Sequence, residues 1–429
     1  MLTQELQIAE RARKYKQEAL TNLHQFIDME MLEDSYRRLN KNSSVGVDGE
    51  SWHSYQAESN HRIRELLSVF KSGKYKSPPI RRVYIPKGKS GKRPIGIPTI
   101  EDKILQEGIR RVLNPIYEEE FKDFAYGFRS GRSAHQAIEY MFKAVSFKGM
   151  HYIIDADIKG YFDSIDHSKL REFLDFRVKD GVIRKMIDKW LKAGIMEDNQ
   201  LRYPKEGTPQ GGKISPLLSN IYLHYVLDGW FSEQIQPLLK GKSFIVRYAD
   251  DFVLGFEYLS DAERVMEVLP KRFGRYNLEL HSEKTKIVNL HIKRGEGERS
   301  FDFLGFTHYL GKSRKGKVVL KRKTSSKKLS QSLQKFKVWL KSNRHKKLKE
   351  LISEVNVRLR GHYSYYGITF NIGGLMSYYE QVKRILQKWL NRRGGKPVWN
   401  WERFNVLIDE WMPLLRPKLY HSYLLAKPI

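Results

Sequence analysis

Two adjacent aspartates, Asp250 and Asp251, interrupt an apolar, strand-like run that spans residues 244–256. Charged side chains are rarely buried unless they are paired or bind a metal. The flanking residues are apolar on both sides and include no turn residues. The run therefore predicts a hairpin with carboxylates at its tip, in preference to the alternative of a solvated turn. A third carboxylate, Asp157, follows another apolar strand at residues 151–154.

If these strands are neighbours in one sheet, the three carboxylates converge. Oxygen ligands without His or Cys suit Mg²⁺, which keeps several waters and also binds substrate phosphates. Two such ions about 4 Å apart stabilise the attacking and the leaving oxygens of an in-line phosphoryl transfer. The aspartates therefore predict metal-assisted chemistry on a phosphate-bearing substrate.

Three further segments are suited to a phosphate-bearing ligand. Residues 207–216 place a glycine pair and Gln210 before a predicted helix, where glycine lets the backbone approach a ligand closely. Lys87 and Arg93 flank a basic, glycine-containing turn that suits a triphosphate. Lys284 has the charge to neutralise, or protonate, a leaving pyrophosphate. Taken singly, each has a plain alternative: a strand-to-helix turn, a solvated basic loop and a surface lysine.

The elements that must position these side chains alternate between helix and strand. Helical patterns cover the first 40 residues and residues 62–70, 168–191, 215–227 and 260–276, with a polar loop at 40–48. Thr99 and Asp102 have the spacing of a helix-capping box. Strand-like segments lie at 82–85 and 151–154, around Asp250, and between 277 and 306. The mixture predicts helices packed around a sheet.

The composition changes after Gly311. Residues 312–349 contain 16 Lys or Arg and no Asp or Glu. Apolar residues at helical 4-3-4 spacing form two stripes: Leu329, Leu333, Phe336 and Leu340, then Leu348, Ile352, Val355 and Leu359. These stripes predict helices with one buried face and a very basic opposite face, and a domain boundary near residue 310.

Overall composition limits the class of protein. The chain has 429 residues, enough for two or three domains, and a net charge of +29, which favours a nucleic-acid partner over an anionic membrane surface. No apolar run approaches the length of a membrane span, and no membrane partner is expected. The chain has no cysteine, which excludes disulfides and thiolate zinc sites. We expect a cytoplasmic protein.

In chain order, seven segments resemble those of the bacterial group II intron-encoded reverse transcriptase/maturase family. They are Arg93–Pro98, Tyr126–Ala134, Asp157–Asp163, Gly207–Gly212, Arg247–Asp251, Phe303–Phe306 and Leu359–Gly367. The resemblance spans roughly residues 35–429, and seven motifs in the correct order are far more specific than any one of them. Many family members carry a His-Asn-His endonuclease with paired cysteines. Because this chain has no cysteine, we expect it to lack that domain.

The resemblance implies an α+β, right-hand polymerase fold, with fingers and palm around an antiparallel palm sheet and an α-helical thumb, or maturase X domain. It divides the chain into an N-terminal helical extension (1–34), fingers and palm (35–310), thumb (311–395) and a short basic nucleic-acid-binding tail (396–429). In that tail, Trp399 or Trp401 either stacks on bases or packs against the thumb, and the sequence slightly favours packing.

The resemblance also implies residue roles. Asp157, Asp250 and Asp251 would be catalytic and would hold two Mg²⁺ ions, with help from the backbone carbonyl of Ile158. The nucleotide-binding residues would be Lys87, Arg93, Phe162, Gln210 and Lys284. Among them, Phe162 would be the steric gate that rejects a 2′-hydroxyl. The primer grip would be Phe303, Leu304, Gly305 and Phe306. The RNA-binding residues would include Lys327, Lys328, Arg360, Tyr363 and Tyr366.

The implied function is RNA-directed DNA polymerisation, together with binding of intron RNA in splicing and mobility (retrohoming). The implied partners are an intron or other structured RNA template, a DNA primer or target, and dNTPs. The implied location is the bacterial cytoplasm, at the nucleoid when the protein is bound to target DNA. Two alternatives stay open. One is a domesticated relative acting in phage defence, beside a CRISPR system or in DNA repair. The other is a non-catalytic RNA-binding splicing cofactor, which the intact set of Asp157, Asp250, Asp251 and Gln210 disfavours.

Overall fold

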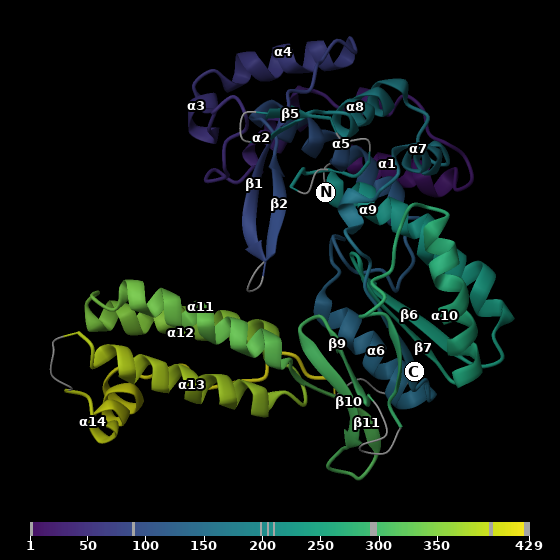
Figure 1. The fold of residues 1–429 in the computed structure, drawn as a ribbon. Helices are drawn as coiled ribbons and strands as arrows, with labels where there is room; N and C mark the ends of the chain where they lie inside the picture. The colour runs from purple at the N-terminus through teal and green to yellow at the C-terminus, as the bar shows by residue number, and fades with distance from the viewer. Residues whose placement is uncertain are drawn as a thin grey trace.

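The computed structural model of the protein describes residues 3–87, 91–197, 200–203, 206–208, 211–291, 298–393 and 398–423. Three parts are visible in Figure 1: an N-terminal lobe at the top, a central sheet with its covering helices, and a C-terminal helical unit at the lower left. The mixed α+β architecture agrees with the sequence-based expectation. None of the described helices is both long and apolar enough to cross a membrane.

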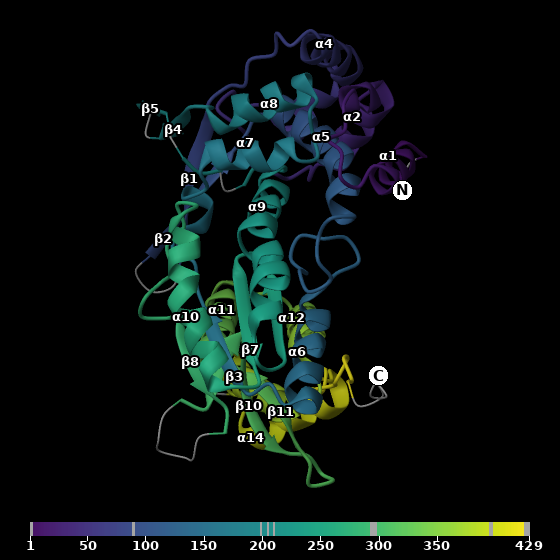
Figure 2. The ribbon, with the colours of Figure 1, turned by 90° about the vertical axis from the view of Figure 1, so that its right-hand side faces the viewer.

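Within the described ranges, the N-terminal lobe contains seven α-helices and a four-stranded sheet, and Figure 2 shows α7 and α8 lying beside α5 in this lobe. Its helices are α1 (Thr3–Lys14), α2 (Met29–Arg37), α3 (Trp52–Gln56), α4 (Ser59–Lys71), α5 (Ile100–Glu118), α7 (His167–Asp175) and α8 (Gly181–Leu191). Its strands are β1 (Ile80–Lys87), β2 (Gly91–Ile97), β4 (Ile195–Glu197) and β5 (Gln200–Arg202), in the order β2-β1-β4-β5. As expected, Thr99 caps α5, because its side chain accepts a hydrogen bond from the Asp102 N–H.

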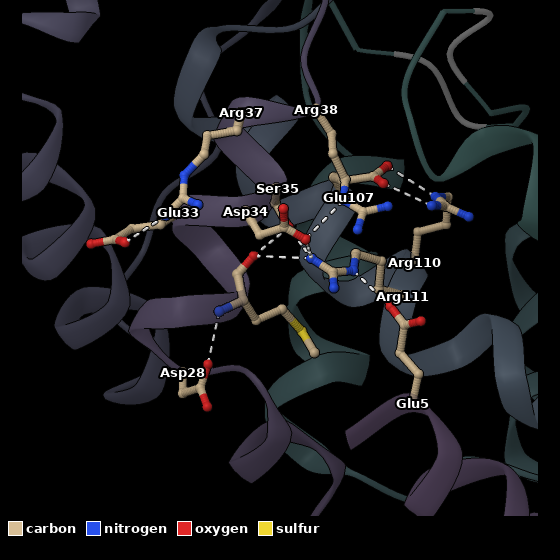
Figure 3. A network of polar contacts seen from close by, with 11 residues as sticks. Glu5, Asp28, Glu33, Asp34, Ser35, Arg37, Arg38, Glu107, Arg110 and Arg111 are labelled. Carbon is tan, nitrogen blue, oxygen red and sulfur yellow. Dashed lines mark hydrogen bonds and ion pairs between the residues drawn. The ribbon is translucent and has the colours of Figure 1, made fainter. Parts of the chain in front are cut away.

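The helical pattern predicted for the first 40 residues is interrupted between α1 and α2. Both helices pack on α5, and Ile8 and Ala12 of α1 belong to the same buried apolar cluster as the α5 core. A buried arginine of α5, Arg111, ties them together by pairing with Glu5 at 2.8 Å and with Asp34 at 3.0 Å (Figure 3). The beginning of the chain is therefore part of the lobe's core.

The central sheet is four-stranded and entirely antiparallel, with the order β6-β7-β3-β8. Its strands are β3 (Tyr152–Ala156), β6 (Ser243–Tyr248), β7 (Asp251–Phe256) and β8 (Lys286–Asn289). The helices that contact it are α6 (Ala134–Lys148) and α10 (Leu259–Gly274). A further helix, α9 (Ser215–Leu223), continues into π-helical turns at His224–Asp228 and Trp230–Ile235. The apolar residues of β6 and β7 are buried, which explains the unbroken hydrophobic runs on either side of the aspartate pair.

A three-stranded sheet connects the central sheet to the C-terminal helical unit. Its strands are β9 (Ser300–Phe303), β10 (Phe306–Lys312) and β11 (Val318–Thr324), and the helices that follow are α11 (Ser326–Asn343), α12 (Leu348–Tyr366), α13 (Ile372–Leu390) and α14 (Trp401–Val406). The two predicted apolar stripes pack in one cluster in this unit, which confirms their helical spacing. The change of composition at Gly311 falls inside β10, because the basic run starts in the β10–β11 hairpin and not at the first helix.

Candidate active site

The register of the central sheet brings the three aspartates to one edge. Ala156, the last residue of β3, pairs with Phe252 of β7, so Asp157 lies one step further along, opposite Asp251. Asp250 lies in the tight turn between β6 and β7, where Tyr248 pairs with Asp251. In that turn Ala249 adopts a left-handed conformation with φ of 60°. Two separate stretches of sequence thus meet through the pairing of neighbouring strands.

The electrostatics of these carboxylates fit a site built for a cation. The Asp251 side chain is exposed at the sheet edge, yet partial desolvation by the surrounding protein raises its pKa to about 6, with contributions from the negative charges of Asp250 and Asp157. Burial also raises the pKa of Asp155, on β3, to about 7, with contributions from Asp302, Asp251 and Asp157 and opposition from Lys286. Carboxylates that disfavour one another's ionisation are stabilised by a positive charge among them. Asp155 was not singled out by the motifs, although its position two residues before Asp157 places it on the same face of the strand.

Positive charges from two distant elements act on the same carboxylate. Arg93 of β2 and Lys328 of α11 both lower the pKa of Asp251, in opposition to its partial desolvation. Arg93 pairs with Ile85 in the β1–β2 hairpin, and Lys87 is the last residue of β1, opposite Gly91. The hairpin points from the N-terminal lobe toward the C-terminal helical unit (Figure 1). The lobe, the central sheet and the helical unit thus face one acidic site.

Asp157 is held by Lys284. The Nζ atom of Lys284 lies 2.5 Å from the Oδ2 atom of Asp157, while Ile158 forms a bridge with Leu280. Two backbone hydrogen bonds form that bridge: the His281 N–H donates to the Asp157 carbonyl, and the Lys159 N–H donates to the Glu279 carbonyl. Within the described residues, no three Asp, Glu or His side chains are gathered closely enough to hold a metal ion as they stand. The oxygen-only donor set and the mutual repulsion of the carboxylates nevertheless fit Mg²⁺.

The proposed nucleotide pocket is described in part. Phe162 lies in a short 3-10 turn (Tyr161–Asp163), and its carbonyl accepts a hydrogen bond from the Thr208 N–H at 2.7 Å. Gly207 fits tightly there, because a Cβ atom would lie 2.9 Å from the Phe162 carbonyl oxygen. Gln210 lies outside the described residues. Gly211 packs against β2, where a Cβ atom would lie 2.4 Å from the Gly96 carbonyl oxygen. Gly207 and Gly211 therefore allow this loop to approach neighbouring backbone closely.

The segment predicted as a primer grip is a tight hairpin turn. Phe303 pairs with Phe306, and the two residues between them, Leu304 and Gly305, have φ of 50° and 82°. Both values are positive, as in a type I′ hairpin turn. The hydroxyl of Tyr365 donates to the Leu304 carbonyl at 2.8 Å. The Leu359–Gly367 segment therefore contacts the turn directly, a relation that the order of the motifs did not reveal.

Side-chain exposure separates the predicted RNA-binding residues. Lys327, Lys328 and Arg360 are exposed. Tyr366 is half-buried, and the centroid of its ring lies 5.2 Å from that of Phe306. Tyr363 is fully buried, and its hydroxyl donates to the Leu415 carbonyl. Its prediction as an RNA contact is therefore corrected: Tyr363 continues the apolar stripe of α12 and packs in the core of the helical unit.

The two tryptophans of the tail differ. Trp399 is half-buried against the core of the helical unit, and its carbonyl accepts hydrogen bonds from Gln387 and Asn391. Trp401 stays 47% exposed. Packing, the alternative that the sequence slightly favoured, thus describes Trp399 only.

An antiparallel sheet that brings carboxylates to one edge, below a basic hairpin and beside a basic helical unit, has the arrangement of a polymerase palm. Comparison with known proteins identifies the family. The family described as "Reverse transcriptase (RNA-dependent DNA polymerase)" matches residues 85–308, slightly over half of the chain. The chain therefore belongs to the reverse transcriptase family.

Individual relatives are consistent with this assignment. The chain is 36% identical over 265 residues to the "Group II intron-encoded protein LtrA" of Lactococcus lactis subsp. cremoris, a match that covers 62% of this chain and 39% of that protein. It is 35% identical over 309 residues to "Protein YkfC" of Escherichia coli (strain K12), covering 64% of this chain and 78% of that protein. It is 33% identical over 261 residues to an "Uncharacterized 91 kDa protein in cob intron" of Schizosaccharomyces pombe, covering 61% and 32%.

The chain thus matches about two-fifths or less of the length of both intron-encoded relatives. The resemblance that the motifs indicated is confirmed: the chain belongs to the reverse transcriptase family and is similar to a group II intron-encoded protein.

Proposed function

We propose that the protein extends the 3′-hydroxyl of a primer with dNTPs along an RNA template. One observation supports this above all others: the β3–β7 register sets Asp157 opposite Asp251, with Asp250 in the adjoining turn. A vestigial site has no physical reason to keep three carboxylates together, where each disfavours the ionisation of its neighbours. The arrangement therefore favours an enzyme over a non-catalytic splicing cofactor.

The reaction is an in-line displacement. The primer oxygen forms a bond to the α-phosphorus of the dNTP and passes its proton to solvent, while the bond from that phosphorus to the bridging oxygen breaks and pyrophosphate leaves. Two Mg²⁺ ions, held by Asp157, Asp250 and Asp251 with the Ile158 carbonyl, would neutralise the charge that develops on the attacking and leaving oxygens. Because Asp157 contacts Lys284 in this structure, it must exchange that contact to act as a ligand, which frees Lys284 for the pyrophosphate.

The surrounding residues would bind and select the nucleotide. Arg93 of the β1–β2 hairpin would hold the triphosphate together with Lys87, and Gln210 would line the pocket. Phe162 follows Asp157 by five residues and is anchored through its carbonyl by Thr208. A backbone fixed in this way sets where the Phe162 ring begins, which suits a gate that excludes a 2′-hydroxyl, because discrimination of a single hydroxyl needs a well-positioned wall.

The nucleic-acid partner would lie along the C-terminal helical unit. Its exposed face carries Lys327, Lys328 and Arg360, and lysines on that face provide affinity for phosphates without sequence readout. We propose that residues 311–395 act as thumb and maturase domain, and residues 396–429 as a short nucleic-acid-binding tail. Similarity to intron-encoded proteins favours intron RNA as the partner in splicing and retrohoming, with a DNA primer or target.

Primer extension on a poly(rA) template with an oligo(dT) primer tests the activity. Asp250→Asn should abolish extension in Mg²⁺ while leaving the affinity for the template–primer within about twofold, because it removes a metal ligand and not a phosphate contact. Glu263→Gln, an exposed carboxylate on α10, is the matched control and should extend normally. Extension by Asp250→Asn at the control rate would refute the assignment.

Two further measurements separate the alternatives. Phe162→Ala should raise the incorporation of ribonucleotides relative to dNTPs, which a purely RNA-binding protein does not show. Splicing of a candidate intron RNA by the Asp250→Asn protein should persist if polymerisation and splicing are separate activities of one chain. If the wild-type protein supports splicing and never extends a primer, the non-catalytic cofactor is the better description.

A further inference from the structure

A fully buried ion pair lies directly behind the catalytic turn. Arg247, near the end of β6, and Asp228, in the π-helical turn after α9, are both 0% exposed. They form a bidentate pair: Arg247 Nε donates to Asp228 Oδ1 at 2.8 Å and Nη2 donates to Oδ2 at 2.5 Å. Burying two charges is costly and is often no more stable than an apolar pair of similar volume. Stability alone therefore gives a poor account of this pair.

The remaining guanidinium nitrogen of Arg247 reaches the turn itself. Its Nη1 atom donates to the Ala249 carbonyl at 3.0 Å and to Asn220 Oδ1 at 2.9 Å. Ala249, which precedes Asp250, has φ of 60°, a conformation that costs a non-glycine residue free energy and persists only where the surroundings hold it. The bond from Arg247 is one such restraint on the residue next to the catalytic pair.

A second restraint comes from the Tyr126–Ala134 segment. Asn220 Nδ2 donates to the Gly127 carbonyl at 2.7 Å. Gly127 lies flat against the turn, because a Cβ atom there would lie 2.2 Å from the Ala249 nitrogen. The backbone of Arg247 is also paired with this segment, through the Phe124 carbonyl and the Tyr126 N–H. Asn220 therefore bridges the two groups that hold Ala249 from either side.

We propose that Asp228, Arg247, Asn220 and Gly127 form a positioning network that fixes the Ala249–Asp251 turn for catalysis. Asp228 orients the guanidinium, Arg247 and Asn220 pass that orientation to the turn, and Gly127 sets the distance of the supporting loop. All four act through the turn and not on the substrate. The network explains why Arg247 and Gly127 lie in two of the resemblance motifs without a role in binding or in chemistry. This proposal rests on the proposed polymerase function.

Three variants test the network. Arg247→Lys keeps the buried charge but has one donor head in place of three nitrogens, so it loses the bond to Ala249 or the bidentate pair. Asp228→Leu with Arg247→Met replaces the ion pair by apolar groups of similar size, which preserves packing but also leaves the Ala249 carbonyl without its donor. Arg272→Lys is the matched control. Arg272 donates to the carbonyls of Tyr225 and Val226, in the same π-helical turn as Asp228, but these bonds do not reach the Ala249–Asp251 turn.

We expect both Arg247 variants to lower kcat about 100-fold, the scale of a misplacement of about 1 Å at a catalytic group. The KM for dNTP and the affinity for template–primer should change less than about threefold, because the phosphate-binding residues are untouched. The amide protons of residues 249–251 should exchange faster in both variants, without any need for activity, while Arg272→Lys should match the wild type in each measurement. The double variant should stay folded, with a melting temperature lowered by the loss of the donor to the Ala249 carbonyl and to Asn220 Oδ1, and not by an unpaired buried charge.

A double variant that regains both the wild-type melting temperature and the wild-type kcat would overturn the proposal, since the ion pair would then serve folding alone. Unchanged exchange at residues 249–251 in Arg247→Lys would also overturn it. If instead the wild-type protein never extends a primer, the proposed function fails, and the exchange measurement still decides whether the network holds the turn.

Discussion

Replacing Arg111 should loosen the attachment of the first two helices to the N-terminal lobe. The Arg111 side chain is 2% exposed and pairs with Glu5 at 2.8 Å and Asp34 at 3.0 Å, while also donating to the Met31 carbonyl (Figure 3). Arg111→Met keeps most of the apolar stem but leaves Glu5 without its guanidinium partner, while Asp34 keeps only its ion pair with Arg38. Breaking a buried pair costs about 3–5 kcal/mol. Both carboxylates keep contact with water, at 16% and 25% exposure, so we expect the lower end, about 3 kcal/mol.

Hydrogen exchange followed by mass spectrometry measures this effect locally, which suits a chain too large to assume two-state unfolding. A loss of about 3 kcal/mol corresponds to roughly 100-fold faster exchange in α1, α2 and the facing part of α5, with little change in the central sheet. Arg37→Ala is the control. Its ion pair with Glu33 is exposed and lies on the same helix as Asp34, so it should cost less than about 1 kcal/mol. Equal exchange in the two variants would refute the view that Arg111 anchors these helices.

Three other predictions follow from particular residues. Burial lowers the pKa of His308 to about 3, so the free energy of opening β9–β11 should fall by up to about 1.4 kcal/mol per pH unit as the pH drops from about 6.5 toward 3. His308→Gln should reduce that slope, measured by hydrogen exchange in β9–β11 after correction for the intrinsic pH dependence of exchange. Lys327→Ala with Lys328→Ala should lower the slope of log Kd for template–primer against log salt by up to about 2, and Lys271→Ala, an exposed lysine on α10, should not change it. Gly305→Ala should lower the thermal stability by about 1 kcal/mol, because φ at this position is 82°.

Much of the site was predictable because its signals are local. An acidic pair between two apolar strands is costly inside a fold unless it lies at a hairpin tip or binds a cation, and Asp157 follows a strand of the same kind. The apolar stripes of α11 and α12 were likewise predictable, since helical spacing is a property of the chain alone. The net charge of +29 follows from composition and needs no three-dimensional information to indicate a nucleic-acid partner.

Other features depend on partners that are far apart in the sequence. Tyr363 lies in the same motif as Tyr365, yet one is buried and the other bonds the Leu304 carbonyl, because helix periodicity sends them to different faces. Arginine is a residue type that is usually exposed, and Arg111 becomes buried only because α1 and α2 pack onto α5. Propensity and motif spacing contain no term for such long-range packing.

Residue types and short spacings were enough to indicate the family, the three carboxylates and the basic helical unit. Which groups hold the Ala249–Asp251 turn depends instead on how distant segments pack. Asp228 lies 19 residues before Arg247 and Gly127 lies 93 residues before Asn220, and no local pattern connects them. Their contacts arise where α9, β6 and the Tyr126–Ala134 segment meet, and a buried charge pair forms there because the fold removes both partners from water.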